Sequence, residues 1–564
     1  MIRKYILKIT TLIAIMILPA TSVAVQLPND KQPSTAGIVE VFDANNKIIG
    51  SVPGIAIDGG GYIITEYEPF RNAARADYVM GKNRIAVSRV GGASDLYDVI
   101  KLLPEKNVGH SFAVSSTAPK AGDKVKIIGS KAKKGTAIET QIMEVSSSNS
   151  INYLSLAQAY DAANVGLPVV NAKGELIGVV QRNGGKDAKT YAIDAKYCSD
   201  MSISAMSWGA ASLTNIKIPA ELPKEEKSAW NYIYMMLETK QDSLRSITAI
   251  NDFLQKYPSS SDGYQLKASF CSSYRDYAGS DKFIQQAISL ATKDTANLYF
   301  SYSKLIYNAA LYDGPKATTN GWTLDKALDE AEKAYRLSHN PLFKIQIGNC
   351  LYGLKRYKEA VDNFTAANQT KIADAQSFYL EARAREKADT TDEKIIVALD
   401  SAIGRFSKPY TVKAAPYLME RGDWYVKFGK YREATLDYIE YEHIVGFNNL
   451  NENFYYMRYK TALQGNMYQT AEEDINRALA IRPNDYVYLA EKAALSLRVG
   501  MMDEAIVWAE KAVKIDSSNP DAYRLLGIAY GEKKNKEKSI SYLKRAVSLG
   551  DKYATELIKN YNSK

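Results

Sequence analysis

Cysteine and histidine are scarce in this chain of 564 residues. The three cysteines, Cys198, Cys271 and Cys350, are odd in number and far apart, so neither a disulfide framework nor a Cys-x-x-Cys metal site is indicated. Only three histidines are present, which leaves little room for a histidine metal cluster. We therefore expect no metal and no cofactor. Cys271 and Cys350 fall in helical patterns, and we expect them to be buried as small apolar residues.

Long apolar runs are also missing after the amino terminus. Residues 1–24 have a basic start, an apolar run from Ile9 to Leu18 and the ending Ser22-Val23-Ala24, which is the layout of a secretory signal peptide. The apolar run is too short to favour a spanning helix. The net charge of +9 is too mild over this length to indicate nucleic-acid binding. We expect a soluble exported protein, periplasmic or secreted, with no membrane span after signal removal.

Residues 34–200 contain short runs rich in Val, Ile and Tyr, separated by clusters of Gly, Asn and Asp. Such runs prefer the pleated surface, and the clusters close the turns between them. Because no helical spacers intervene, the pattern predicts an all-β barrel or sandwich. The expected strands include Ile38–Phe42, Ile48–Val52, Gly54–Ile57, Tyr62–Thr65, Arg84–Val87, Lys124–Ile128, Ala137–Ile142, Tyr153–Leu156 and Leu176–Gln181.

Four landmarks in this unit resemble, in the same order, a trypsin-like serine protease of the HtrA type. They are Ile55–Asp58 with Gly61–Thr65, then Ala121–Gly129, Asn164–Val180 and Tyr191–Asp194. The resemblance implies an all-β trypsin-like double barrel for residues 34–200.

The same resemblance assigns positions to the catalytic triad. The histidine position falls on Glu68, the serine position on Val165, and the aspartate position on Asp95, with Asp98 left open because the register is uncertain. The glycine two residues before the serine, which forms the oxyanion turn, is replaced by Ala163. Triad catalysis needs a hydroxyl nucleophile and an imidazole base. The degenerate positions therefore imply a pseudoprotease without catalytic residues.

An active enzyme with relocated residues is the alternative. His110 is the only histidine between residues 34 and 200, and a pair with Ser111 or Ser130 is compatible with the sequence. In that case the protein is an active trypsin-like serine endopeptidase, and the second half of the chain delivers its substrate.

A proline-containing linker at residues 201–224 separates this unit from a region of helical period at 225–564. Ala471, Ala505 and Ser539 are each 34 residues apart, and the surrounding pattern resembles tetratricopeptide (TPR) repeats. The resemblance implies an all-α superhelix. In that pattern a glycine or alanine on the first helix of each pair lets the second helix approach, and a large residue on the second helix fills the gap to the next pair.

These observations predict a multidomain protein with an all-β double barrel followed by a TPR superhelix. The concave face of such an array commonly binds a protein or an extended peptide. We therefore expect an exported scaffold or adaptor. A purely architectural envelope protein is a third possibility, and the oligomeric state stays open.

Overall fold

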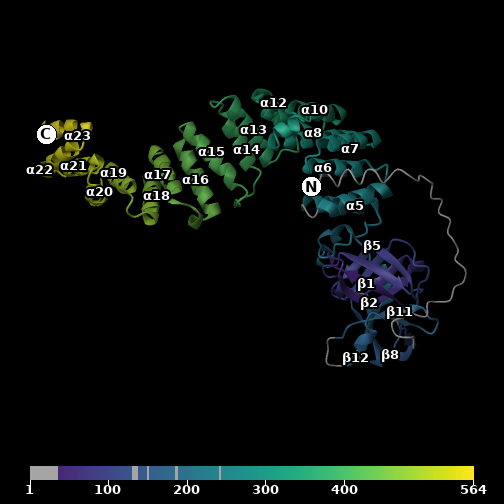
Figure 1. The fold of residues 1–564 in the computed structure, drawn as a ribbon. Helices are drawn as coiled ribbons and strands as arrows, with labels where there is room; N and C mark the ends of the chain where they lie inside the picture. The colour runs from purple at the N-terminus through teal and green to yellow at the C-terminus, as the bar shows by residue number, and fades with distance from the viewer. Residues whose placement is uncertain (1–35, 130–136, 149–150, 184–187, 240–242, 564) are drawn as a thin grey trace. The chain divides into compact units, whose positions relative to one another are not determined.

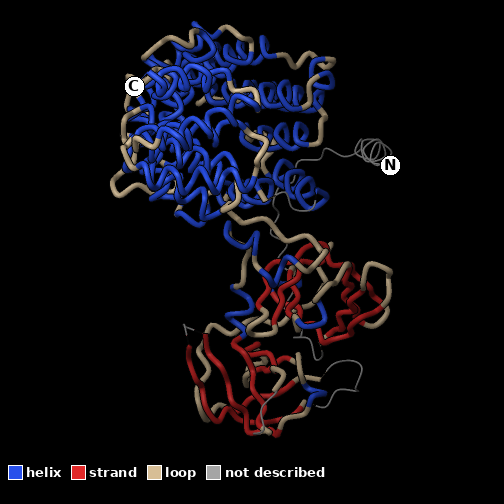
Figure 2. Tube along the Cα trace, turned by 90° about the vertical axis from the view of Figure 1, so that its left-hand side faces the viewer, coloured by secondary structure: helices blue, strands red, loops and turns tan. Residues whose placement is uncertain are grey.

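The computed structural model describes residues 36–129, 137–148, 151–183, 188–239 and 243–563 (Figure 1). The expected signal peptide at 1–24 lies outside the described residues. The chain divides into two compact units, and the division falls between Phe270 and Cys271, within α6 (Ser261–Ser273). Strands occur only in the first unit among the described residues, as the colouring of Figure 2 shows.

The first unit contains two closed barrels of six antiparallel strands. The first barrel has the strand order β1-β2-β3-β6-β5-β4, and the second has the order β10-β11-β12-β9-β8-β7. Both interiors are filled by Val, Ile and Leu side chains, which suit a pleated surface. The strands are β1 (Gly37–Phe42), β2 (Ile48–Ile57), β3 (Tyr62–Thr65), β4 (Arg75–Met80), β5 (Asn83–Ser94), β6 (Val99–Pro104), β7 (Lys124–Ile127), β8 (Ile138–Ser148), β9 (Ile151–Ala159), β10 (Pro168–Val170), β11 (Leu176–Val180) and β12 (Lys189–Asp194).

Some strand predictions need correction. The two runs expected at residues 48–52 and 54–57 form one strand, β2, because Pro53 stays in register with Ile38 of β1 and the pairing continues across it. Strand β4 was not predicted, and β5 is much longer than the expected Arg84–Val87. Both close the first barrel, so tertiary pairing rather than local propensity decides their extent.

The two barrels pack against each other through a shared apolar cluster. Ile55 and Val99 of the first barrel lie in one cluster with Val179 and Ile193 of the second, and all four are buried. Cys198 is buried in the same cluster. The loops beside this interface carry the positions that the sequence assigned to the triad.

The segment after the second barrel returns to the first barrel. Val90 of β5 donates its N–H to the Pro219 carbonyl at 2.9 Å and accepts from the Glu221 N–H at 2.8 Å. Helices α4 (Glu226–Glu238) and α5 (Ser243–Lys256) bury Ile233 and Phe253 in the core cluster of the first barrel. The first compact unit therefore includes helices that lie beyond the linker expected at 201–224.

The helices of the second unit follow each other as antiparallel pairs with short connections. Beyond α4 to α6, the longer helices are α7 (Tyr277–Leu290), α8 (Thr295–Tyr312), α10 (Leu324–Ser338), α11 (Pro341–Gly353), α12 (Tyr357–Asn368), α13 (Ala375–Ala388), α14 (Lys394–Ile403), α15 (Ala415–Lys427), α16 (Tyr431–Val445), α17 (Glu452–Gln464), α18 (Tyr468–Ile481), α19 (Tyr486–Arg498), α20 (Met502–Ile515), α21 (Pro520–Glu532), α22 (Lys536–Ser548) and α23 (Lys552–Ser563). The short helices α2 (Ala195–Asp200), α3 (Ala211–Thr214) and α9 (Pro315–Thr318) lie in connections.

The close approach expected of a repeat is present at Gly422 in α15 and Gly527 in α21. A Cβ added to Gly422 would lie 2.5 Å from the Tyr438 ring, and one added to Gly527 would lie 2.5 Å from Leu543. Each glycine meets a large side chain sixteen residues later, on the second helix of its own pair. Glycine is needed because any larger residue would separate the two helices.

Two further features concern the whole described chain. Cys271 and Cys350 are buried, as predicted. Among the described residues, no helix is both long enough and apolar enough to span a membrane.

Candidate functional site

The loop assigned to the nucleophile forms a short 3-10 turn, η3 (Ala162–Asn164), before Val165. Asp161 caps this turn and accepts the Ala163 N–H at 2.9 Å through Oδ1. The Val165 N–H points back to the Ala162 carbonyl at 3.4 Å. Val165 is only 6% exposed, so its branched apolar side chain is shielded from solvent.

The N–H groups of Ala163 and Val165 therefore both bond within the turn. In a trypsin-type site, the N–H groups at these two positions face the substrate and stabilise the oxyanion. Here the Asp161 carboxylate occupies one of them and the turn itself occupies the other. An anion pocket built from these two groups requires a different conformation of the loop.

Asp98 is the aspartate that contacts the histidine position. It stands just before β6 and accepts the Glu68 N–H at 2.7 Å through Oδ1, while its carbonyl accepts the Tyr67 N–H at 3.2 Å. Asp95 lies exposed in the turn between β5 and β6. Glu68 itself is exposed and pairs with Arg71 at 2.7 Å.

Two residues that the sequence did not single out lie at the centre of this region. Glu66 follows β3 and is 5% exposed, and its carboxylate lies 2.7 Å from the Arg182 guanidinium, which follows β11 in the other barrel. A Cβ added to Gly166 would lie 3.0 Å from Glu66 Oε1. The Glu66–Arg182 pair therefore joins the two barrels directly beside the loop of Val165.

Burial perturbs both carboxylates in the cleft. It raises the pKa of Glu66, and the Arg182 guanidinium opposes this effect only in part. Burial also raises the pKa of Asp98, against the Glu68 N–H that stabilises its charged form. The alternation of acids at residues 66 and 68 was a weak signal in the sequence, but nothing local marked Arg182, because its partner is 116 residues away.

The structure also shows the surroundings of His110, the histidine of the alternative serine–histidine pair. The two ring nitrogens of His110 contact the Tyr78 hydroxyl at 2.9 Å and the Val108 carbonyl at 3.1 Å. Ser111 is half-buried beside it, and Ser130 lies outside the described residues.

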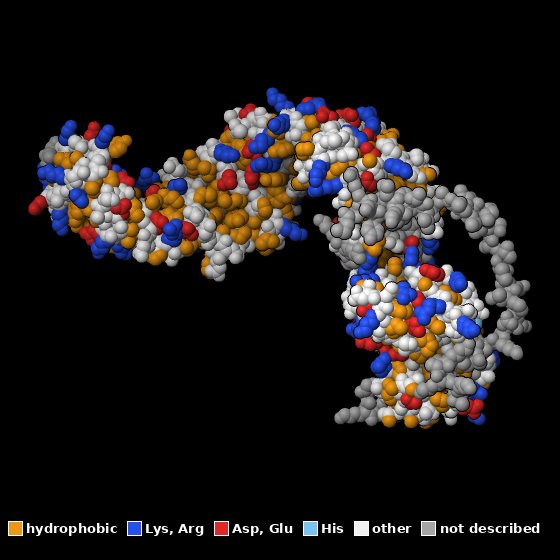
Figure 3. Space-filling model, viewed as in Figure 1, with side chains coloured by type: hydrophobic (Ala, Val, Ile, Leu, Met, Phe, Trp, Pro, Cys, Tyr) orange, Lys and Arg blue, Asp and Glu red, His pale blue; other side chains and the backbone are white. Residues whose placement is uncertain are grey.

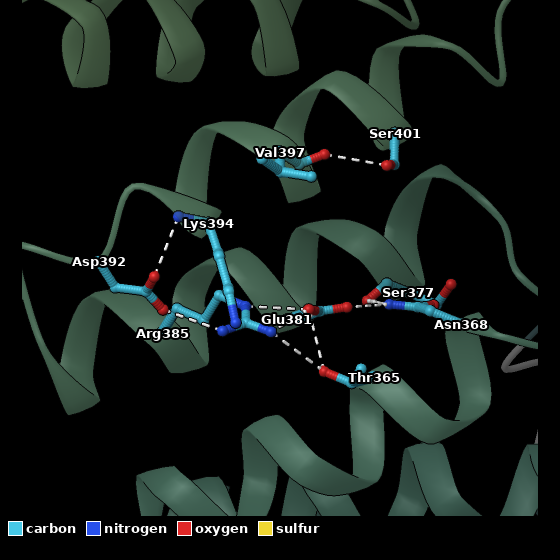
Figure 4. A network of polar contacts seen from close by, with 9 residues as sticks. All are labelled: Thr365, Asn368, Ser377, Glu381, Arg385, Asp392, Lys394, Val397 and Ser401. Carbon is cyan, nitrogen blue, oxygen red and sulfur yellow. Dashed lines mark hydrogen bonds and ion pairs between the residues drawn. The ribbon is translucent and has the colours of Figure 1, made fainter.

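The repeats contain a second kind of polar site, buried between helices. Figure 4 shows Glu381 of α13 accepting hydrogen bonds from Thr365 and Asn368 of α12 and pairing with Arg385. Arg385 also pairs with Asp392 at 2.9 Å. Among the buried side-chain nitrogen and oxygen atoms of this network, only Asn368 Oδ1 has no hydrogen-bond partner. The network therefore holds α12, α13 and the start of α14 together.

Comparisons with known proteins found one family match and several similar solved structures. The tetratricopeptide repeat family matches residues 520–550. No curated protein matches the chain. Among solved structures, the active form of a protease from M. tuberculosis is 14% identical and aligns with 30% of this chain and 79% of its own, with a TM-score of 0.26.

Two other solved structures are also similar to this chain. A serine endoprotease from Yersinia pestis is 21% identical over 29% of this chain and 60% of its own, with a TM-score of 0.25. A TPR protein described as having an unusual peptide-binding site is 18% identical over 41% of this chain and 97% of its own, with a TM-score of 0.23. The predicted architecture, a trypsin-like double barrel followed by TPR-type helical repeats, is confirmed by the strand topology, the helix pairs and the repeat match.

Proposed function

We propose that this protein is an exported scaffold or adaptor that binds a protein or extended peptide through its repeats and whose double barrel does not hydrolyse peptides. The observation that carries the proposal is the loop at residues 161–166. The serine position holds a buried valine, and the N–H groups of Ala163 and Val165 bond inside the turn.

Loss of the hydroxyl alone removes the covalent step. The nucleophile and its base together supply a rate factor on the order of 10⁶ in such triads. Glu68 at the histidine position is exposed and paired with Arg71, and it has no hydroxyl to activate. In this proposal the cleft is either a passive binding surface or has no binding role. The Glu66–Arg182 pair keeps the two barrels together.

The repeats supply the binding surface in this proposal. On the face seen in Figure 3, apolar side chains gather over the middle repeats, around α14 to α16. Large apolar side chains that are more than half exposed in or beside these helices are Val397, Val412, Leu436 and Phe447. Exposed apolar groups that cluster on a soluble surface commonly mark a protein-binding site, and we place the partner on the concave face of the array.

The proposal is tested by assaying the purified protein without its first 24 residues. We expect no cleavage of casein and no labelling by a serine-directed fluorophosphonate. Trypsin is the positive control for both assays. The triple variant Glu68→His, Ala163→Gly and Val165→Ser, which restores the residue types of a triad and an oxyanion turn, is the matched comparison. Stoichiometric labelling of the unmodified chain, abolished by replacing one serine, would instead establish the endopeptidase with relocated residues.

A further inference from the structure

The connections between successive repeats carry a line of exposed apolar side chains. Because the helices alternate in direction, the connections from the second helix of one pair to the first helix of the next all lie along one edge of the array. Four of these connections follow one another, from α14–α15 to α20–α21. Each contains or adjoins a large apolar side chain that is 46% to 67% exposed, and we call this set the apolar edge: Val412, Phe447, Ile481, Val487 and Ile515.

The opposite edge of the same helices differs in composition. It is formed by the connections inside the pairs, namely α13–α14, α15–α16, α17–α18 and α19–α20, all of which the structure describes. Of these four, only the last exposes large apolar side chains, those of Val499 and Met501. Exposed apolar residues are therefore not a general property of the turns in this array, and their recurrence on one edge needs its own explanation.

The structure holds part of the apolar edge in place. Phe406 and Tyr410 of the α14–α15 connection pack in one apolar cluster with Ile444 near the end of α16. The Tyr455 hydroxyl donates to the Phe447 carbonyl at 3.3 Å, which fixes the backbone that carries this exposed ring. Figure 3 shows apolar side chains gathered over the same middle repeats. Single exposed apolar residues are ordinary, but a connected set of them marks an interaction surface.

Positive charge is concentrated at one end of the apolar edge. Residues 404–414 contain Arg405, Lys408 and Lys413, which are all exposed, and they contain no acid. The next two connections carry no net charge, and the last, at residues 516–519, contains a single acid. A partner that matches this edge is therefore apolar along its length and acidic at one end.

An amphipathic helix has this distribution. Its side chains at i, i+3, i+4 and i+7 form a continuous apolar stripe, which can meet all four connections. Acidic residues stabilise the first turn of a helix through the helix dipole, so the acidic end is its amino terminus. The edge of an open sheet does not compete as a partner-binding element here, because the repeats contain no strand among the described residues.

We propose that the apolar edge binds an amphipathic helix of a partner protein, with the acidic first turn of that helix on residues 404–414. An anionic lipid surface is the other apolar and acidic candidate, but it suits basic residues spread along the whole contact. Here they are confined to one end. The inference rests on the proposed binding role of the repeats and names the kind of segment that a partner presents to this edge.

The test measures fluorescence anisotropy of labelled designed helices of about 21 residues with the full-length mature protein. The first probe has one stripe of leucines and glutamates in its first turn. The second has lysines in place of those glutamates, and the third has the composition of the first with the stripe scrambled. We expect the first probe to bind about tenfold or more tightly than the scrambled probe and severalfold more tightly than the lysine probe.

One pair of variants tests the apolar contact. The double variant Val412→Ser, Phe447→Ser removes two exposed side chains and should fold normally. We expect it to bind the first probe about tenfold more weakly. Tyr312→Ser is the matched control, because Tyr312 is 83% exposed at the end of α8, on the opposite edge. It should bind the probe as the unmodified protein does.

A second pair of variants tests the charge. The double variant Lys408→Glu, Lys413→Glu should reverse the preference, so that the lysine probe binds more tightly than the glutamate probe. A role of these lysines in stability alone predicts no such reversal. Lys355→Glu is the matched control, because Lys355 is exposed in the α11–α12 connection on the opposite edge. It should keep the original preference.

Equal binding of the first and scrambled probes would overturn the proposal, as would an unreversed preference in the Lys408→Glu, Lys413→Glu variant. Binding to vesicles of anionic phospholipid that is lost in the Val412→Ser, Phe447→Ser variant, with no binding of the helical probes, would assign the edge to a membrane surface instead. The cleavage and labelling assays test the proposed function by other measurements, so failure of the one is distinguishable from failure of the other.

Discussion

The cleft between the barrels and the core of the repeats both pair arginine with carboxylates, but the two regions differ in how far the arginine is enclosed. The Arg182 side chain is 58% exposed although its partner Glu66 is buried, whereas the Arg458 side chain is 2% exposed and its partner Asp474 is fully buried. Water can replace part of the interaction at Arg182. At Arg458 nothing but protein surrounds the charge.

This difference determines how much stability each region loses when its charge pair is removed. A charge pair at an open cleft can be lost or replaced at modest cost. A charge pair between stacked helices is tied to the packing of two neighbouring repeats, since Arg458 contacts carboxylates of both α16 and α18. We therefore expect a much larger penalty for the same substitution in the repeats.

The largest expected effect is that of Arg458→Ala. The change leaves Asp474 and Glu442 buried without their central partner, and we expect a loss of about 3–5 kcal/mol in the free energy of unfolding. Urea unfolding followed by far-ultraviolet circular dichroism measures the loss, and hydrogen exchange at α17 and α18 locates it. Arg477→Ala is the control, because Arg477 is 44% exposed and Glu442 keeps Arg458. An equal loss in both variants would contradict the comparison.

The corresponding change in the cleft is Arg182→Ala. It leaves the buried Glu66 without its guanidinium partner, and we expect a cost of about 1–3 kcal/mol. Hydrogen exchange should increase at the end of β3 and in the loop of Val165, where Glu66 lies against Gly166. Arg71→Ala removes an exposed arginine whose partner Glu68 is also exposed, and its effect on the free energy of unfolding should be negligible. If Arg182→Ala were as mild as this control, the pair would not connect the barrels.

The smallest expected effect is a pH dependence from Asp98. Because burial raises the pKa of Asp98, the folded state holds this proton more strongly than the unfolded state does. The associated stability is present below the ordinary aspartate pKa of about 4 and is lost as the pH rises through the raised value. Asp98→Asn does not titrate and keeps an oxygen for the Glu68 N–H. The variant should therefore gain stability relative to the unmodified protein between pH 4 and pH 7.5, measured by urea unfolding, and a difference that does not vary with pH would refute this assignment.

Local patterns were enough to predict much of the fold. The repeat pairs at Gly422 and Tyr438 and at Gly527 and Leu543 follow from a fixed spacing of sixteen residues along one helical hairpin. Short β-type runs and turn residues predicted an all-β barrel or sandwich, and the resemblance to trypsin-like proteases narrowed this to a double barrel. Strand β4 was missed because its pairing with β1 and β5, and not its composition, makes it a strand.

The contents of the cleft could not be predicted in the same way. Asp95 and Asp98 are both plausible in sequence, and only the course of the chain before β6 brings Asp98 to the Glu68 N–H. The direction of the Ala163 N–H depends on the capping by Asp161, which a sequence pattern does not report.

The sequence by itself determined the order of the two architectures, the absence of a hydroxyl at Val165 and the spacing of the helical pairs, because each depends on residue type or on neighbours within one hairpin. Only the tertiary structure decided that Glu66 meets Arg182 and that Arg458 meets both Glu442 and Asp474. Both depend on side chains from separate segments meeting in space, and the free energy of such a meeting is set by burial and by partners that the local sequence does not contain.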